Sequence, residues 1–387
     1  MTRVLFYILF ITVALIIMGS VHYYLYRRLI RDPALPGPWR RGALVLLAAL
    51  ALSQPMVFGI TKLFSPETAR TLVFGPYVWM GSLLYLVLLL GLIDLIKLGA
   101  RVKGGGVDAG RRVFLSRLGA GATVTATAGL SALAVRQAVL NVTVKNVDVT
   151  LRRLPRALDG ITIVQLTDLH LGPTLGSRWA EGVVRKVNAL GPDVVVITGD
   201  LADGRATNLD PALAPLSKIE APLGRYFVTG NHEYYIDTDA ILAKVRALGF
   251  TVLRNQRVRV GRGGHSFDLA GIDDHNARRH RPDHGPDLGK ALAGRDPKRE
   301  LVLLAHQPRA IDIAARHGVG LQLSGHTHAG QLWPWTYLVY LQQPYVAGLV
   351  NHKGTQLYIS AGTGYWGPPM RLGTTSEITR VVLRARG

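Results

Sequence analysis

The chain has 387 residues, of which 48% are hydrophobic and none is cysteine. The absence of cysteine excludes disulfides, thiolate metal sites and cysteine nucleophiles. The formal net charge of +20 favours an anionic partner such as nucleic acid, lipid headgroups or a phosphate compound. The high apolar fraction makes membrane-spanning segments the first feature to examine.

Long apolar runs in the first third of the chain predict a membrane region over residues 1–140. We expect transmembrane helices at residues 4–26, 43–62 and 71–96, because each run is long enough to cross a bilayer. The alternative, buried helices of a soluble core, is disfavoured because such helices normally keep a polar face.

A fourth apolar segment, residues 113–137, leaves two interpretations open. The preceding stretch GRRVFLSR contains the pair Arg111 and Arg112, and an arginine pair before a weakly apolar run resembles a twin-arginine export signal. Ala132-Leu133-Ala134 would supply the small residues of a cleavage site. The other interpretation is an ordinary fourth transmembrane helix with basic flanks.

Basic residues concentrate in the loops after the first and third spans, and few lie in the loop between the second and third. The two basic loops contain Arg27, Arg28, Arg31, Arg40 and Arg41, and Lys97, Arg101, Lys103, Arg111 and Arg112; the middle loop contains Lys62 and Arg70. The positive-inside rule places the two basic loops in the cytoplasm. We therefore expect a multi-pass protein of a bacterial inner membrane whose C-terminal region lies outside the cytoplasm. Topology then explains much of the positive charge, and no nucleic-acid partner is expected.

Residues 147–387 predict an α/β domain, because short β-branched runs alternate with Gly, Pro and polar clusters. A helix is expected over Ser177–Leu190, with Ser177 as the N-cap and Gly191 just past the end.

Five predicted strands end at side chains that bind cations. These are Asp168 and His170, Asp200, Asn231 and His232, His306, and finally His326 and His328. In an extended chain a spacing of two places both members of a pair on one face. Nitrogen and oxygen ligands without sulfur suit Zn, Fe, Mn or Co better than Ca. Because this set exceeds the needs of one ion, two ions sharing a bridging carboxylate are the economical interpretation.

The order of these blocks resembles the calcineurin-like metallophosphoesterase superfamily. The chain has DLH at 168–170, GDLAD at 199–203, GNHE at 230–233, an isolated His306, and GHTH at 325–328. The resemblance implies an α/β fold, a four-layer sandwich of two mixed β-sheets flanked by helices.

The resemblance also implies a role for each residue and two divalent ions, which would be Mn, Fe or Zn. One ion would be held by Asp168, His170 and His328, the other by Asn231, His306 and His326, with Asp200 bridging. His232 would be the acid near the leaving group, oriented by Asp203. The implied reaction is hydrolysis of a phosphodiester or pyrophosphate bond by attack of a hydroxide that bridges the metals.

Within the superfamily, GHTHAGQ and the tail GTGYWGPPMRLGTTSEIT are similar to membrane-linked bacterial phosphoesterases. Some members of that branch act on lipid or cell-envelope phosphodiesters, including UDP-diacylglucosamine pyrophosphate bonds. The expected partners are therefore membrane lipids and a phosphorylated lipid or envelope substrate. Arg371 in the tail would bind a second phosphate or a uronate; the alternative is a solvated arginine on a turn.

Two further segments each allow two interpretations. The stretch Asp273–His284 has three histidines and several carboxylates, and a solvated insertion loop is favoured over a third metal site because no strand fixes its geometry. The apolar stretch that continues from Trp333 through Thr336–Leu349 either packs on its own domain or enters a membrane interface.

Two other functions compete with the enzyme interpretation. A catalytically silent relative that binds phosphate ligands or partners is disfavoured by the complete ligand set. A transporter with a regulatory domain is disfavoured because Asp94 is the main ionisable residue within the spans.

Overall fold

The computed structural model describes residues 3–102 and 108–387, and its internal contacts divide the chain into two units. We call Met1–Phe64 with Thr71–Val135 the helical unit, and Ser65–Arg70 with Arg136–Gly387 the sandwich unit. Lys103, which we counted in the loop after the third span, lies outside the described residues.

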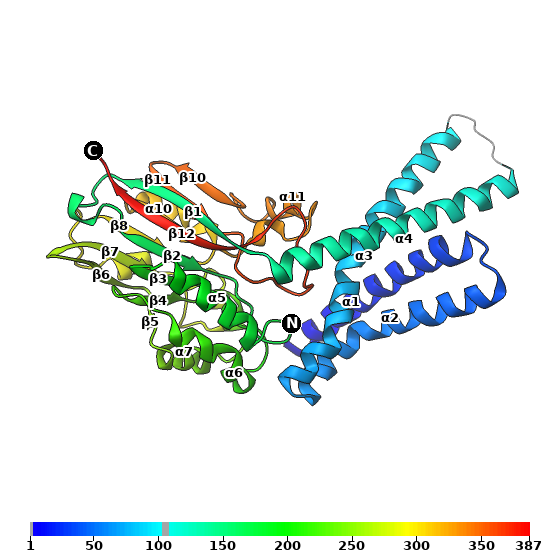
Figure 1. Cartoon of the computed structure of the whole chain (residues 1–387), viewed down its shortest axis with the longest axis horizontal. Helices are drawn as coiled ribbons and strands as arrows, with labels where there is room; N and C mark the ends of the chain where they lie inside the picture. The colour runs from blue at the N-terminus through cyan, green and yellow to red at the C-terminus, as the bar shows by residue number, and fades with distance from the viewer. Residues whose placement is uncertain (1–2, 103–107) are drawn as a thin grey trace. The chain divides into compact units, whose positions relative to one another are not determined.

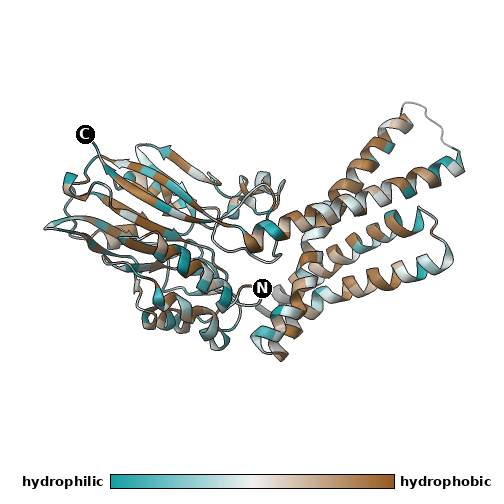
Figure 2. Cartoon of the chain, viewed as in Figure 1, coloured by the Kyte–Doolittle hydropathy of each residue, from teal (hydrophilic) through white to brown (hydrophobic). Residues whose placement is uncertain are grey.

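Long apolar helices make up the helical unit, and two of them extend for a few residues into the sandwich unit. The helices are α1 (Arg3–Leu25), α2 (Gly37–Leu63), α3 (Pro66–Val102) and α4 (Ala109–Leu140), with a π-helical turn, η1 (Tyr26–Arg31), after α1. By length and composition, all four could cross a membrane, and hydrophobic residues run along each of them (Figure 2). Mean hydropathy is 1.5 for α4 and 2.0 to 2.2 for the other three. The fourth segment is therefore the least apolar, as its sequence indicated.

Asp94, the main ionisable residue of the predicted spans, is paired inside the helical unit. Its Oδ2 accepts a hydrogen bond from the Tyr24 hydroxyl at 2.7 Å and lies 2.9 Å from the Arg28 guanidinium. A charged side chain among membrane helices needs such a partner. The carboxylate therefore has a structural role, which further weakens the transport interpretation.

The sandwich unit contains two six-stranded mixed sheets (Figure 1). The first has the order β1-β12-β2-β3-β4-β5 and the second β10-β11-β9-β8-β7-β6. The strands of the first sheet are β1 (Val142–Leu151), β2 (Thr162–Leu166), β3 (Val194–Thr198), β4 (Arg225–Val228), β5 (Thr251–Val252) and β12 (Ser376–Ala385). Those of the second are β6 (Gln256–Arg262), β7 (His265–Gly271), β8 (Leu301–Leu304), β9 (Leu321–Ser324), β10 (Gly348–His352) and β11 (Thr355–Ile359).

Three hydrophobic layers hold this unit together. Ile163, Val196 and Leu323 belong to the layer between the two sheets. A second layer joins the first sheet to α5 (Ser177–Ala189), α6 (Asp210–Leu213) and α7 (Thr238–Ala247), and a third joins the second sheet to α9 (Leu288–Ala291) and α10 (Ile311–Arg316). Since β2 and β3 are covered on both faces, every residue in them is buried, which explains their unbroken apolar sequences. The predicted four-layer α/β sandwich is confirmed.

Helix α5 corrects one local prediction. Ser177 is the first residue of the helix and Gly176 is the N-cap, with no side-chain capping bond. Amphipathic packing stabilises the helix instead, because Ala180, Val183 and Val187 are buried against the first sheet. At the other end, Gly191 has φ of +55°, the left-handed conformation in which glycine commonly ends a helix.

Candidate metal centre

The residues expected to bind metal all follow the carboxyl ends of strands. Strands β2, β3 and β4 of the first sheet end at Leu166, Thr198 and Val228, and β8 and β9 of the second end at Leu304 and Ser324. In α/β folds, binding residues cluster at the carboxyl ends of the strands, because parallel strands all end at the same edge of the sheet. The site therefore draws on both sheets.

The backbone at these positions is not extended. Asp168, His170, Asp200, His326 and His328 have φ between +46° and +72°, the left-handed region that non-glycine residues rarely adopt. The prediction that a two-residue spacing along a strand aligns these side chains is therefore wrong, because β2 and β9 end before them. Left-handed turns direct the side chains inward, and such backbone strain clusters at functional sites.

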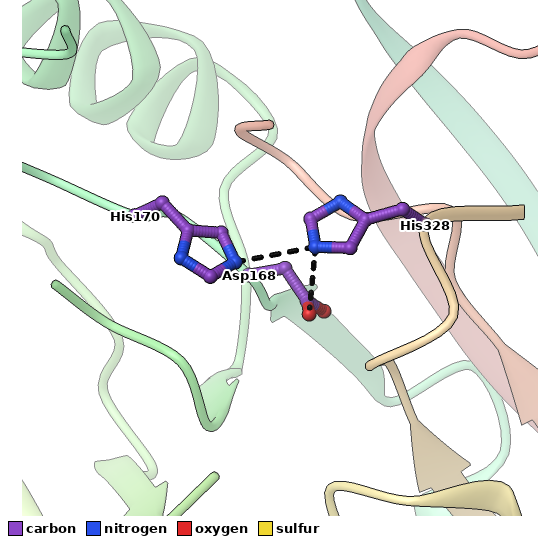
Figure 3. Close-up of side chains that lie close together, drawn as sticks. All are labelled: Asp168, His170 and His328. Atoms are coloured by element: carbon purple, nitrogen blue, oxygen red, sulfur yellow. Dashed lines mark hydrogen bonds and ion pairs between the residues drawn. The ribbon is translucent and has the colours of Figure 1, made fainter. Parts of the chain in front are cut away.

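Asp168, His170 and His328 form the first group of converging side chains (Figure 3). Nε2 of His170 lies 3.2 Å from Nε2 of His328, which lies 3.3 Å from Asp168 Oδ1. The Asp168 carboxylate is fixed by the backbone N–H of His326 at 3.0 Å and by the Thr167 hydroxyl at 2.7 Å. Three donor atoms from two strand ends thus face one small volume.

A second group contains Asp200, His306 and His326. Nε2 of His306 lies 3.1 Å from Nδ1 of His326 and 3.1 Å from Oδ1 of Asn231. The other ring nitrogen of His306 donates to the Thr198 carbonyl at 2.8 Å, and a hydrogen bond of that kind fixes the tautomer of a metal-binding histidine.

Asp200 lies between the two groups. Its Oδ2 is 3.2 Å from Nε2 of His306 and 3.9 Å from Nε2 of both His170 and His232. Its Oδ1 accepts the backbone N–H of His232 at 2.9 Å, which fixes the direction of the carboxylate. The position fits a carboxylate shared by two cations.

The electrostatics of these buried groups fit divalent cations. Among the described residues, no Lys or Arg forms an ion pair with the buried Asp168 or Asp200, and an uncompensated buried carboxylate is costly. Burial, followed by the positive charge of His306, lowers the pKa of His326 to about 3. Burial and the neighbouring His170 also lower the pKa of His328. Both imidazoles are therefore neutral. Burial lowers the pKa of His306 as well, but the charge of Asp200 raises it well above its usual value, so His306 would release a proton when a cation binds.

His232 and Asp203 form a pair at the edge of the site. Nδ1 of His232 lies 2.6 Å from one Asp203 oxygen, and Nδ1 of His170 lies 3.1 Å from the other. Burial lowers the pKa of His232, but the charge of Asp200 and the hydrogen bond to Asp203 raise it to about 9. The His232 side chain is 13% exposed and that of His306 0%. His232 thus faces solvent as a proton donor would, and Asp203 orients two histidines where the resemblance implied one.

Glu233 is a residue of the site to which the sequence pattern assigns no role. Its buried carboxylate accepts the backbone N–H groups of Asp200 at 3.0 Å, Leu201 at 2.8 Å and Gly230 at 2.6 Å. Burial, followed by the charge of Asp200, raises its pKa to about 7. Glu233 therefore joins the loops after β3 and β4. Its place in GNHE was visible in the sequence, but the backbone groups it binds were not.

Two glycines of the motifs are required by close packing. A Cβ at Gly230 would lie 2.2 Å from Asp200 Oδ1, and one at Gly325 would lie 2.2 Å from Asp168 Oδ2. In each case the atom that would clash belongs to a ligand from a different motif. The backbone of one motif therefore packs directly against a ligand side chain of another.

Arg371 has a different role from the one expected of it. The side chain is fully buried, so neither a substrate contact nor a solvated turn describes it. Its guanidinium donates to the carbonyls of Ala361 at 2.7 Å, Gly364 at 2.6 Å and His328 at 3.2 Å, and Nη2 is 3.2 Å from Nδ1 of His328. Burial lowers its pKa to about 10. Arg371 thus positions His328.

The segment Asp273–His284 is solvent-exposed at His275 and over residues 278–280, as expected of a solvated loop, but its two ends are buried. Asp273 forms a buried ion pair with Arg254 at 2.8 Å, and Asp274 and His284 are buried. The side chains at the two ends of the segment are therefore part of the folded unit. Within the part of the chain that the structure describes, no group that could hold a metal includes this segment.

The comparisons with known proteins agree with this geometry. The family model of the calcineurin-like phosphoesterase matches residues 161–330. A transmembrane protein with metallophosphoesterase domain from Bos taurus is 41% identical over 362 residues, 88% of this chain and 80% of the relative. A protein of the same description from Danio rerio is 44% identical, over 62% of this chain and 57% of the relative.

A bacterial relative, an uncharacterized metallophosphoesterase from Helicobacter pylori, is 40% identical over 61% of this chain and 62% of the relative. The chain thus spans less than two thirds of the zebrafish and Helicobacter relatives but 80% of the bovine one. With this coverage, the family match and the converging ligand groups, the chain belongs to the calcineurin-like phosphoesterase family of metal-dependent phosphoric ester hydrolases.

Proposed function

We propose that this protein is a membrane-anchored phosphoesterase that hydrolyses a phosphodiester or pyrophosphate bond of a lipid-linked or cell-envelope substrate. One observation carries the proposal: Asp200 lies between two groups of buried nitrogen and oxygen donors. That arrangement suits a pair of divalent ions, Mn, Fe or Zn, better than a purely structural site. The complete donor set also argues against a catalytically silent relative.

The proposed ligands divide between the two ions as the two groups do. Asp168, His170 and His328 would hold one ion, Asn231, His306 and His326 would hold the other, and Asp200 would be available to both. Two divalent ions at such a site lower the pKa of a bound water and stabilise negative charge on the phosphoryl oxygens.

The side chains around the ions supply the proton transfer. His232, protonated and partly exposed, donates a proton to the departing oxygen. Asp203 accepts from Nδ1 of His232 at 2.6 Å, which leaves Nε2 directed away from the carboxylate. The same carboxylate fixes His170, so the acid and a metal ligand are oriented together.

We further propose that the protein is multi-pass in a bacterial inner membrane, with the sandwich unit outside the cytoplasm. The named relatives from cattle and zebrafish are transmembrane proteins, and the basic loops favour this orientation. Both interpretations of residues 113–137 place the sandwich unit outside the cytoplasm, but only an uncleaved fourth helix keeps that unit anchored to the membrane. A periplasmic reporter fused at residue 387 should be active, and an inactive fusion would reverse the orientation.

Metal analysis combined with an assay on bis-p-nitrophenyl phosphate tests the catalytic proposal. Wild-type protein should carry two ions per chain and cleave the diester. Asp200→Asn should lose metal and at least about a thousandfold of kcat/KM, since it removes the shared ligand of a two-metal site. Asp210→Asn makes the same chemical change at an exposed carboxylate that pairs with Lys244 and should retain both. Wild-type protein without metal, or a fully active Asp200→Asn variant, would refute the enzyme proposal.

A further inference from the structure

An exposed apolar surface lies directly after the last metal-binding motif. We call residues 332–349 the apolar loop; it contains no charged residue and no histidine. Its exposed large side chains are Trp333, Trp335, Tyr337, Leu338, Tyr340, Leu341 and Leu349. Leu341 is 81% exposed. A contiguous surface of this kind on a folded domain normally marks an interaction site.

The apolar loop is anchored at both ends, so its exposure is not that of a loose segment. Leu332 and Val346 are buried, and the Val346 carbonyl accepts from the Thr327 hydroxyl at 2.6 Å. Between them, the Thr336 hydroxyl donates to the Ala329 carbonyl at 2.9 Å, at the start of the short helix α11 (Thr336–Val339). The fold therefore holds the exposed aromatic residues in place.

The same surface reaches the proposed acid. The side-chain amide of Gln331 donates to the Trp366 carbonyl at 2.9 Å and accepts the Trp366 backbone N–H at 3.0 Å. The Trp366 ring is 58% exposed and lies 6.0 Å from the His232 ring. Gln331, next to the apolar loop in the chain, thus holds Trp366 beside the proposed acid, so the exposed aromatic surface extends to the edge of the metal centre.

We infer that the apolar loop inserts into the lipid interface of the bilayer and that, granted the proposed function, the lipid substrate reaches the metal centre along it. Tryptophan and tyrosine beside leucine suit the boundary between headgroups and acyl chains. A protein-binding surface normally carries a polar and charged rim, whereas residues 332–349 carry no charge. The chain also carries helices that could cross a membrane, so the sandwich unit is tethered near lipid.

Site-directed fluorescence tests the insertion without any assay of activity. Because the chain has no cysteine, Leu341→Cys gives a single labelling site for the environment-sensitive dye NBD on the full-length protein. The labelled protein is placed in nanodiscs of phosphatidylcholine and phosphatidylglycerol that contain lipids with a nitroxide at acyl carbon 5. Asp296→Cys is the control, because Asp296 is exposed in the turn before β8, at the opposite edge of the sheet from the metal centre.

The nitroxide lipid should reduce emission from position 341 by roughly twofold or more, since an interfacial segment buries its apolar face about 5–10 Å deep. The same lipid should leave position 296 unchanged. Blue-shifted emission at position 341 without lipid quenching would mean that protein covers the loop, from this chain or from a second copy. That result, or a dye at position 341 that remains in water, would overturn the inference.

A second measurement separates substrate delivery from the chemistry. The double variant Tyr337→Asp, Leu341→Asp should cleave soluble bis-p-nitrophenyl phosphate as the wild type does. Its hydrolysis of a fluorescent phospholipid diester in phosphatidylglycerol vesicles should fall about tenfold or more, because two buried charges oppose interfacial binding. Equal losses on both substrates would overturn the delivery route. If wild-type protein cleaves neither substrate, the proposed function fails, and the quenching result decides the insertion by itself.

Discussion

The apolar loop follows the last motif of the metal centre in the sequence, but the two regions differ in which side chains they bury. The centre buries carboxylates and imidazoles on a strained backbone, whereas the loop exposes tryptophan, tyrosine and leucine on a well-anchored one. Each arrangement is unfavourable in water alone. The comparison teaches that neither region is satisfied by the folded chain alone, which agrees with divalent cations at the centre and with the lipid interface that we propose for the loop.

Apart from the loss of Asp200, the largest effect should come from replacing the proposed acid. His232→Asn should lower kcat/KM for an alkyl phosphodiester by about 10²–10⁴-fold, the usual contribution of a positioned proton donor. The loss should be much smaller for p-nitrophenyl esters, because p-nitrophenolate departs without a proton. His317→Asn, at an exposed histidine, serves as the control. Equal losses on both substrates together with loss of metal would instead make His232 a ligand, as its proximity to His170 and Asp200 also permits.

A smaller effect is expected at Arg371. Lysine cannot reproduce the fork that holds the carbonyls of Ala361, Gly364 and His328. Arg371→Lys should therefore weaken metal binding about 10–100-fold, the usual consequence of disturbing a residue that orients a ligand. The metal affinity is measured as the metal retained after dialysis against increasing concentrations of a chelator. The exposed Arg384→Lys is the control. An unchanged metal affinity with a raised KM would restore the original assignment of Arg371 to substrate binding.

The smallest effects concern folding stability and compare a buried contact with an exposed one. Glu233→Gln should lower the free energy of unfolding by about 1–3 kcal/mol, because it removes an acceptor from buried backbone N–H groups. Leu341→Ser should change it by less than about 0.5 kcal/mol, as expected for an exposed position. Both changes in unfolding free energy are measured by denaturant titration in detergent, followed by a spectroscopic signal of the sandwich unit. The exposed Glu181→Gln is the matched control. A large loss at Leu341 would mean that the loop packs on its own domain.

The sequence predicted which residues meet but not how the backbone brings them together. The apolar strands and the polar residues after them were sufficient to predict an α/β domain with candidate ligands from Asp168 to His328, and the two-sheet sandwich came from the family resemblance. Propensity gives no signal for a left-handed aspartate or histidine, so the turns at Asp168 and His326 were missed. The role of Arg371 was missed for a related reason. An arginine among glycines and prolines is usually exposed, and only the folded chain shows the carbonyls that enclose it.

Asp203 ties two histidines of the site to one carboxyl group. One of its oxygens lies 3.1 Å from Nδ1 of His170 and the other lies 2.6 Å from Nδ1 of His232. Because both oxygens belong to one planar group, a rotation of the His170 ring that turns the carboxylate also moves the acceptor of His232. The orientations of the two imidazoles are therefore coupled through a single side chain.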